Sequence, residues 1–166
     1  MIVYTLLLKR RTWHNIVIGG AAGAFPPLVG WAAVTNDVAP LAVWLFAIVF
    51  LWTPVHFWAL ALLIKDEYQN AAVPMLPVVK GDKATVIQIV FYMILTVLAT
   101  LAPAYYGFTG LTYLVACGIL NAGLVVFTIA LAKQVNKLRA MVLFKYSMLY
   151  LALLFLMLAI DRSVAI

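Results

Sequence analysis

Residues 51–83 read LWTPVHFWALALLIKDEYQNAAVPMLPVVKGDK, and this stretch decides both the fold and the place of the chemistry. Its first part is an apolar run that carries one histidine, His56. The run stops at Lys65, Asp66 and Glu67, and prolines and further lysines follow. An apolar run that ends in charges is typical of a helix that leaves a membrane at its polar surface. Carboxylates, lysines and aromatic rings gathered there suit a ligand that is anionic at one end and apolar at the other, as isoprenoid diphosphates are.

The whole chain is too apolar for an ordinary soluble domain. It is 67% hydrophobic and 10% charged, whereas soluble domains average about 25% charged residues. A helix needs roughly 20 apolar residues to cross a bilayer, and five segments qualify: 15–35, 40–64, 85–106, 110–132 and 141–160. Because these runs are continuously apolar, unlike the alternating strands of an outer-membrane barrel, we predict an all-α transmembrane bundle of about five helices.

The basic residues predict how the bundle sits in the membrane. Alternating the five spans places every lysine and arginine except Arg162 on one side. Basic loops stay in the cytoplasm, so we expect this side to be cytoplasmic. The net charge of +6 is accounted for by this face. It favours anionic headgroups or substrates over nucleic acid, because no soluble basic surface is available.

Packing features are also visible along the chain. Small residues four apart, from Gly19 to Gly23, predict close approach of the first span to a neighbour. Pro26 and Pro27 should kink or interrupt that span midway. The region 65–83 is expected to be the only long loop, and long structured loops are often functional.

Several motifs resemble the protoheme IX farnesyltransferases (haem O synthases), a family of the UbiA superfamily of intramembrane prenyltransferases. They are WTPVHFWALAL and PMLPVVKG in the stretch quoted above, YTLLLKRRTWHNIVIGGAAGAFPPLVGWAAV before it, and FKYSMLYLALLFLMLAIDR near the C-terminus. The resemblance implies the C-terminal five helices of a nine-helix fold. Residues 1–166 are then expected to be a partial prenyltransferase domain, inactive alone, because the N-terminal half and the first aspartate-rich motif are missing.

The resemblance also implies an activity. A farnesyl group would pass from farnesyl diphosphate to a vinyl group of protohaem IX, giving haem O for terminal oxidases. Mg²⁺ or a similar divalent cation would assist, and haem would be a substrate rather than a cofactor. The expected setting is the lipid bilayer of a bacterial inner membrane, with the missing N-terminal half or a haem A synthase as further partners. The alternatives are a prenyltransferase for a quinone or other aromatic acceptor, and a non-catalytic membrane subunit or half-transporter.

The strongest candidates for chemistry are the adjacent acids Asp66 and Glu67. Mg²⁺ binds carboxylate oxygens together with substrate phosphates, so we predict a metal site here, with Asp66 also catalytic. The alternative is that both acids only solvate a helix end. Superfamily members often have a second acid four residues on, where this chain has Asn70. Asp82 is a weaker reserve candidate.

Three residues near the N-terminus are candidates through the resemblance. The tyrosine and lysine of the YTxxLK motif look like diphosphate-binding groups, which implies catalytic roles for Tyr4 and Lys9 and substrate binding by Arg10. The alternative is that the basic residues only set the topology. Asn15, in the first turn of the next helix, is added as a substrate-binding candidate.

His56 and the aromatic residues around it are the candidates within a span. Ionisable residues inside membranes are costly and usually functional, so we predict that His56 contacts the substrate. A neutral histidine bonded to a neighbouring helix is the alternative. Trp52 and Tyr68, with Phe57 and Trp58, could line an isoprenoid channel and stabilise an allylic cation. Aromatic belts at membrane interfaces offer the competing explanation.

Overall fold

The computed structural model describes residues 15–164, which form helices and no strands. Five long helices are α1 (Asn15–Thr35), α2 (Pro40–Leu63), α5 (Gly81–Tyr105), α6 (Leu111–Lys133) and α7 (Lys137–Val164), and two short ones are α3 (Lys65–Asn70) and α4 (Leu76–Val79). The five long helices are long and apolar enough to cross a membrane. The predicted all-α bundle with about five spans is therefore confirmed.

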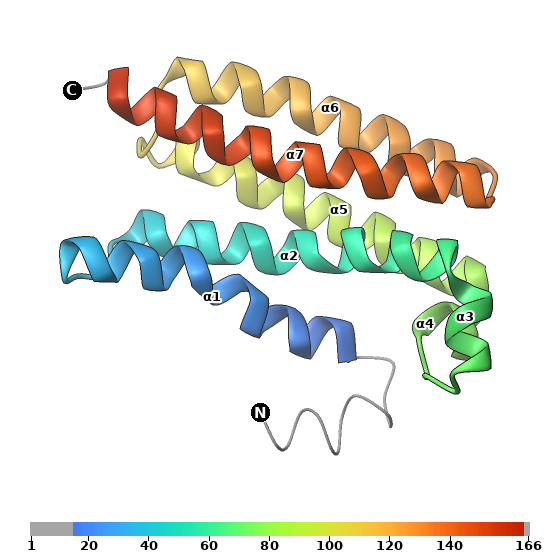
Figure 1. The fold of residues 1–166 in the computed structure, drawn as a ribbon. Helices are drawn as coiled ribbons and strands as arrows, with labels where there is room; N and C mark the ends of the chain where they lie inside the picture. The colour runs from blue at the N-terminus through green and yellow to red at the C-terminus, as the bar shows by residue number, and fades with distance from the viewer. Residues whose placement is uncertain (1–14, 165–166) are drawn as a thin grey trace.

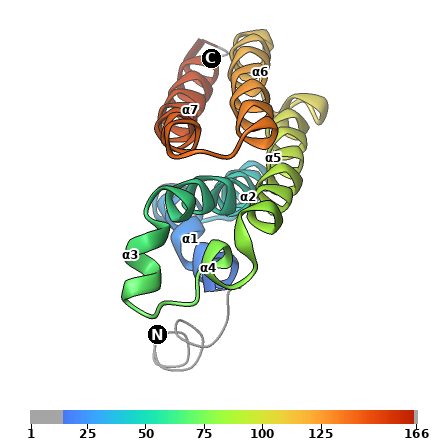
Figure 2. The ribbon, with the colours of Figure 1, turned by 90° about the vertical axis from the view of Figure 1, so that its right-hand side faces the viewer.

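Four of the long helices close into a ring. Helix α2 packs against α5, α5 against α6, α6 against α7, and α7 against α2. Helix α1 lies outside this ring and packs on α2 alone among the described helices. Figure 2 shows the arrangement end on, with α6 and α7 above α2 and α5, and with α1 below α2. Helix α1 consequently leaves much of its surface open beside α7.

The charged segments gather at one end of the bundle. The C-terminus of α2, the short helices α3 and α4, the start of α5 and the α6–α7 connection all lie there (Figure 1). The short connections 36–39 and 106–110 lie at the other end with the C-terminus of α7. Both connections turn through left-handed residues, Asn36 with a φ of 53° and Gly107 with a φ of 74°.

The region 65–83 is more ordered than the predicted loop. Asp66 and Glu67 occupy the first turn of α3, where carboxylates interact favourably with the helix dipole. A proline lies in the first turn of α4. Gly81, with a φ of 82°, then lets α5 begin at once, four residues before the predicted span. The predicted long loop therefore contains two short helices, because each of them has its own start signals.

Small residues set the approach of α1 to α2, as predicted, and Gly20 is a position of close contact. A Cβ on Gly20 would lie 2.9 Å from Thr53 Cγ2, so glycine is needed there. A Cβ on Gly23 would meet nothing within 4 Å. Pro26 and Pro27 lie inside α1, which continues through them as one helix and changes direction midway (Figure 1).

Polar side chains join the helices of the ring inside the apolar core. Asn121 on α6 donates from Nδ2 to Thr100 Oγ1 (3.0 Å) and accepts from Tyr150 Oη (2.8 Å). Tyr113 Oη donates to the carbonyl of Thr100 (2.9 Å). Hydrogen bonds between helices replace the hydrophobic driving force that lipid cannot provide. This network fixes α5, α6 and α7 together.

One buried acid was missed by the sequence reasoning, which ended the last span at residue 160. Asp161 is 4% exposed. Its Oδ2 accepts from the Gly110 N–H (2.6 Å) and its Oδ1 from the Tyr113 N–H (3.1 Å). The first N–H groups of a helix lack partners within that helix, so Asp161 caps α6 from α7.

Candidate functional site

A polar cavity of about 380 Å³ lies at the charged end of the bundle. Five segments build it: the end of α2, helix α3, the start of α5, the α6–α7 connection and the first residue of α7. The residues that line this charged cavity are Leu62, Lys65, Asp66, Gln69, Asp82, Val135, Asn136 and Lys137. Two acids and two lysines thus meet at a membrane surface, although the first and last of them are 72 positions apart.

Asp66 faces the cavity and pairs with Lys137, whose Nζ donates to Oδ2 at 2.9 Å. The Lys137 ammonium lowers the pKa of Asp66, first through this hydrogen bond and then through its charge. Asp66 is therefore ionised at neutral pH. Because both side chains are largely exposed, the pair contributes little to stability, and a stronger ligand can displace Lys137.

The second pair joins Lys65 and Asp82 at 2.7 Å, with both side chains partly exposed. Sequence reasoning held Asp82 only in reserve, and the structure brings it into the cavity. Glu67 lies outside the cavity lining and is exposed, because consecutive residues on a helix point roughly 100° apart. Tyr68 is partly exposed on α3, where burial and Glu67 raise its pKa.

The donor set of the charged cavity fits part of a Mg²⁺ site. No group of three or more His, Cys, Asp or Glu within residues 15–164 could hold a metal ion. Mg²⁺ bound to phosphate needs only one or two protein carboxylates, and Asp66 and Asp82 can supply these. Two carboxylates balanced by two lysines leave the cavity near neutral, so a cation would bind there together with an anionic ligand.

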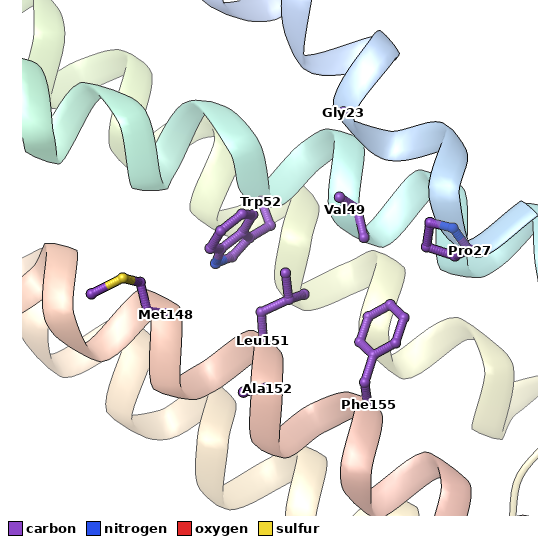
Figure 3. Close-up of a pocket in the computed structure, with 8 residues that line it drawn as sticks. All are labelled: Gly23, Pro27, Val49, Trp52, Met148, Leu151, Ala152 and Phe155. Carbon is purple, nitrogen blue, oxygen red and sulfur yellow. The ribbon is translucent and has the colours of Figure 1, made fainter. Parts of the chain in front are cut away.

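An apolar groove runs between α1 and α7, with α2 as its floor. It consists of two adjoining cavities of about 460 Å³ and 280 Å³, which share Gly23, Val49 and Trp52. Figure 3 shows Trp52 and Val49 on α2 facing Leu151 and Phe155 on α7 across the larger cavity. The smaller cavity continues along α1 to Ile16 and Phe57, toward the charged end.

Trp52 is held in the groove by a hydrogen bond from its Nε1 to the carbonyl of Ser147 (2.9 Å). Trp52 lines both parts of the groove, and its predicted role in an isoprenoid channel stays a prediction. Phe57 also lines the groove. Trp58 is fully buried instead and packs edge-on against Tyr92, so it belongs to the core. Tyr68 is not among the groove residues.

His56 stacks on Trp52 and is only 8% exposed. Its ring stacks between Trp52 and Phe144, with centroids 4.5 Å and 4.6 Å away. Its Nδ1 lies 2.8 Å from Ser147 Oγ, so His56 is bonded to a neighbouring helix, which was the alternative left open. Substrate contact stays a prediction.

Ser147 contacts one ring nitrogen of His56, Nδ1, and its hydroxyl oxygen also lies 2.7 Å from the carbonyl oxygen of Phe144. The neutral ring has one donor and one acceptor, and Nδ1 can take either role toward the hydroxyl. When Nδ1 carries the proton, the lone pair on Nε2 can bind a metal or accept a proton.

The other predicted residues fall outside this description. Tyr4, Lys9 and Arg10 precede the described residues, and the side chain of Asn15 is not described. Conversely, sequence reasoning missed Lys137, Phe144 and Ser147 as neighbours of the candidate residues. No local signal marks them, because they lie far along the chain and meet α2 or α3 only through packing of α7.

Comparisons with known proteins agree with the motifs. Residues 1–159 match the UbiA prenyltransferase family. Three relatives carry the name protoheme IX farnesyltransferase. The protein of Thermus thermophilus is 61% identical over 99% of this chain and 27% of its own length. The protein of Deinococcus radiodurans is 56% identical over 99% of this chain and 54% of its own length. That of Roseiflexus castenholzii is 50% identical over 99% of this chain and 31% of its own length.

The chain thus spans from 27% to 54% of the length of these relatives. No solved structure matches it. The family match covers nearly every residue, including the charged cavity, the apolar groove and His56. The chain is an integral membrane protein that belongs to the UbiA prenyltransferase family.

Proposed function

We propose that this chain is part of an enzyme that transfers a farnesyl group from farnesyl diphosphate to a vinyl group of protohaem IX. The names of the relatives support the reaction. The observation in the structure that supports it best is the charged cavity at the membrane surface, at the end of the same helix that floors the apolar groove. An isoprenoid diphosphate needs a charged site for its diphosphate group and an apolar site for its hydrocarbon chain.

The diphosphate would lie in the charged cavity. Lys65 and Lys137 would donate to its oxygens once they exchange their carboxylate partners for phosphate, since ammonium groups bind phosphate strongly. Asp66, together with Asp82 from the lining of the same cavity, would hold Mg²⁺ against the same oxygens. The metal would neutralise charge that develops on the leaving diphosphate.

The farnesyl chain would lie in the apolar groove. When the bond between its first carbon and the diphosphate oxygen breaks, the bonding electrons leave with the diphosphate and an allylic cation remains. The indole face of Trp52 would stabilise this cation, and the apolar walls exclude water from it. The vinyl group of protohaem then supplies two electrons for the new carbon–carbon bond, and water adds to the resulting cation and loses a proton.

A chimeric enzyme tests this function. Residues 1–166 would replace the matching segment of the 56%-identical relative from Deinococcus radiodurans, so that the family's full length is present. Membranes that contain the chimera should convert protohaem and farnesyl diphosphate to haem O, measured by mass spectrometry. Prenylation of an aromatic quinone precursor in preference to haem would contradict the proposed acceptor.

The same assay addresses the chain by itself. We expect the 166-residue chain alone to form no haem O, because the described residues supply only part of a metal site. Uncompensated diphosphate charge in a water-poor site costs several kcal/mol. Haem O produced by the purified chain without a partner would refute this expectation.

We further propose that His56 contacts the haem through Nε2. His56→Ala should then weaken haem binding to the chimera and alter the absorption spectrum of bound ferric haem. Ser147→Ala should weaken binding by roughly 10-fold, the scale for losing a group that orients a ligand, while Ser163→Ala at the far end of α7 should not. If His56→Ala changed neither the spectrum of bound haem nor the haem affinity, His56 would not contact the haem and would only pack against its neighbours.

The bacterial inner membrane is the proposed location, with the charged cavity on the cytoplasmic side. Cysteines introduced at Asn36 and Gln134 should react with a membrane-impermeant maleimide from opposite sides, and only position 134 from the cytoplasm. Native Cys117 is buried and gives no background. Labelling of both positions from the same side would overturn this topology.

A further inference from the structure

A second groove opens on the outer flank of the ring, between α5 and α6. It encloses about 450 Å³ and is lined by Lys83, Val86, Ile87, Val90, Ala132 and Val135. The hydrogen bonds that tie α5 to α6 are far away, around Thr100. At the rise of a helix, Thr100 lies roughly 25 Å from Lys83 along α5. The two helices are therefore joined at one end and leave this flank groove open at the other.

The flank groove has one cationic end and an apolar body. Lys83 lies in the first turn of α5, and Val90 lies about 10 Å deeper by helical rise. Among residues 15–164 the ion pairs are Lys65 with Asp82 and Lys137 with Asp66, so Lys83 has no carboxylate partner there. Ile87 is 65% exposed. A ligand in this groove would meet an ammonium at the membrane surface and only aliphatic side chains below it.

We infer that the flank groove binds an anionic phospholipid of the surrounding bilayer. The headgroup phosphate would pair with Lys83, and one acyl chain would pack along Val86, Ile87 and Val90. A lysine near an anionic membrane surface contributes about 1 kcal/mol of attraction. Among residues 15–164, no residue of α1 or α7 lines the flank groove, so this lipid is distinct from the ligand of the apolar groove.

An isoprenoid diphosphate fits the flank groove less well. The lining contains no aromatic ring to stabilise a cation and no carboxylate to hold a metal against the diphosphate. Val135, however, also lines the charged cavity, so the two spaces share a wall. A farnesyl chain that reached the flank groove from the charged cavity is therefore the competing occupant to test.

The full 166-residue chain would be reconstituted in phosphatidylcholine vesicles with a trace of spin-labelled lipid. Electron paramagnetic resonance measures the lipid immobilised on the protein. We expect spin-labelled phosphatidylglycerol to bind about fivefold more tightly than spin-labelled phosphatidylcholine. Lys83→Gln should abolish this preference, whereas Lys80→Gln, which removes the same charge outside the groove, should keep most of it.

A second pair of variants leaves the charge unchanged. Ala132→Phe fills the groove and should lower the immobilised fraction of phosphatidylglycerol, while Ala122→Phe, on an exposed part of the same helix, should not. The inference would be overturned if Lys83→Gln and Lys80→Gln reduced the preference for phosphatidylglycerol equally and Ala132→Phe had no effect. The preference would then come from general attraction between basic residues and the anionic membrane surface. Displacement of the labelled lipid by stoichiometric farnesyl diphosphate would assign the groove to the isoprenoid instead.

Discussion

Asp66→Asn in the chimera is expected to lower haem O formation by at least ~10²-fold, the scale for losing one strong electrostatic stabiliser. The substitution keeps the shape of the side chain and removes the charge that would hold Mg²⁺. The ion pair with Lys137 is also lost, but both partners are exposed, so the amount of folded protein in the membrane should not change. Turnover at several Mg²⁺ concentrations measures the effect.

Two neighbouring substitutions on α3 serve as controls for Asp66. Asn70→Ala should have little effect, because an amide is a weak Mg²⁺ ligand and Asn70 lies outside the charged cavity. Glu67→Gln should cost much less than Asp66→Asn, since Glu67 also lies outside the cavity lining. A large loss from Glu67→Gln would show instead that both acids bind the metal. Near-normal turnover by Asp66→Asn would show that Asp66 does not bind the metal and only solvates the end of a helix.

Gly23→Leu should lower farnesyl transfer by roughly 10²-fold and raise the KM for farnesyl diphosphate. Gly23 lines both parts of the apolar groove, and a Cβ there meets nothing within 4 Å. The new side chain would therefore occupy the groove without disturbing the packing of α1 on α2. Displacing a substrate by even about 1 Å from its reacting position can cost 10²-fold.

Two other glycines on α1 separate this blocking effect from effects on folding. A Cβ on Gly30 also meets nothing within 4 Å, and Gly30 does not line the groove, so Gly30→Leu should be nearly silent. Gly20→Leu should instead reduce the amount of folded protein, because its Cβ would lie 2.9 Å from Thr53. If Gly23→Leu and Gly30→Leu had the same activity, the groove would not hold the farnesyl chain.

Part of the candidate site was predictable from the sequence. Asp66 ends an apolar run at a charged boundary, Trp52 lies in a long apolar helix, and the resemblance to the farnesyltransferase motifs favoured both as candidates. The structure places them at the charged cavity and the apolar groove, and their roles stay predictions. The adjacent Glu67 looked equivalent to Asp66. Only the orientation of α3 distinguishes them, because it points one acid into the cavity and the other into solvent.

The neighbours of these residues could not be predicted. Lys137 reaches Asp66 across 71 positions of sequence, and Ser147 reaches His56 across 91. A lysine in a basic loop and a serine in an apolar helix carry no local signal of a partner. The second contact engages Nδ1 of His56, so the sequence alone could identify the histidine but not which ring nitrogen bonds to the neighbouring helix.

The sequence by itself determined the number of spanning helices, their order and the side on which the charges gather. These follow from apolar length and the cost of burying charge in lipid, which are properties of local composition. Tertiary structure alone decided that α1 stands outside the ring, that Gly20 rather than Gly23 is in close contact, and that Asp161 caps α6. Such features depend on which helix faces approach one another, because in lipid the contacts between apolar surfaces gain little from burial and are selected by shape and hydrogen bonds.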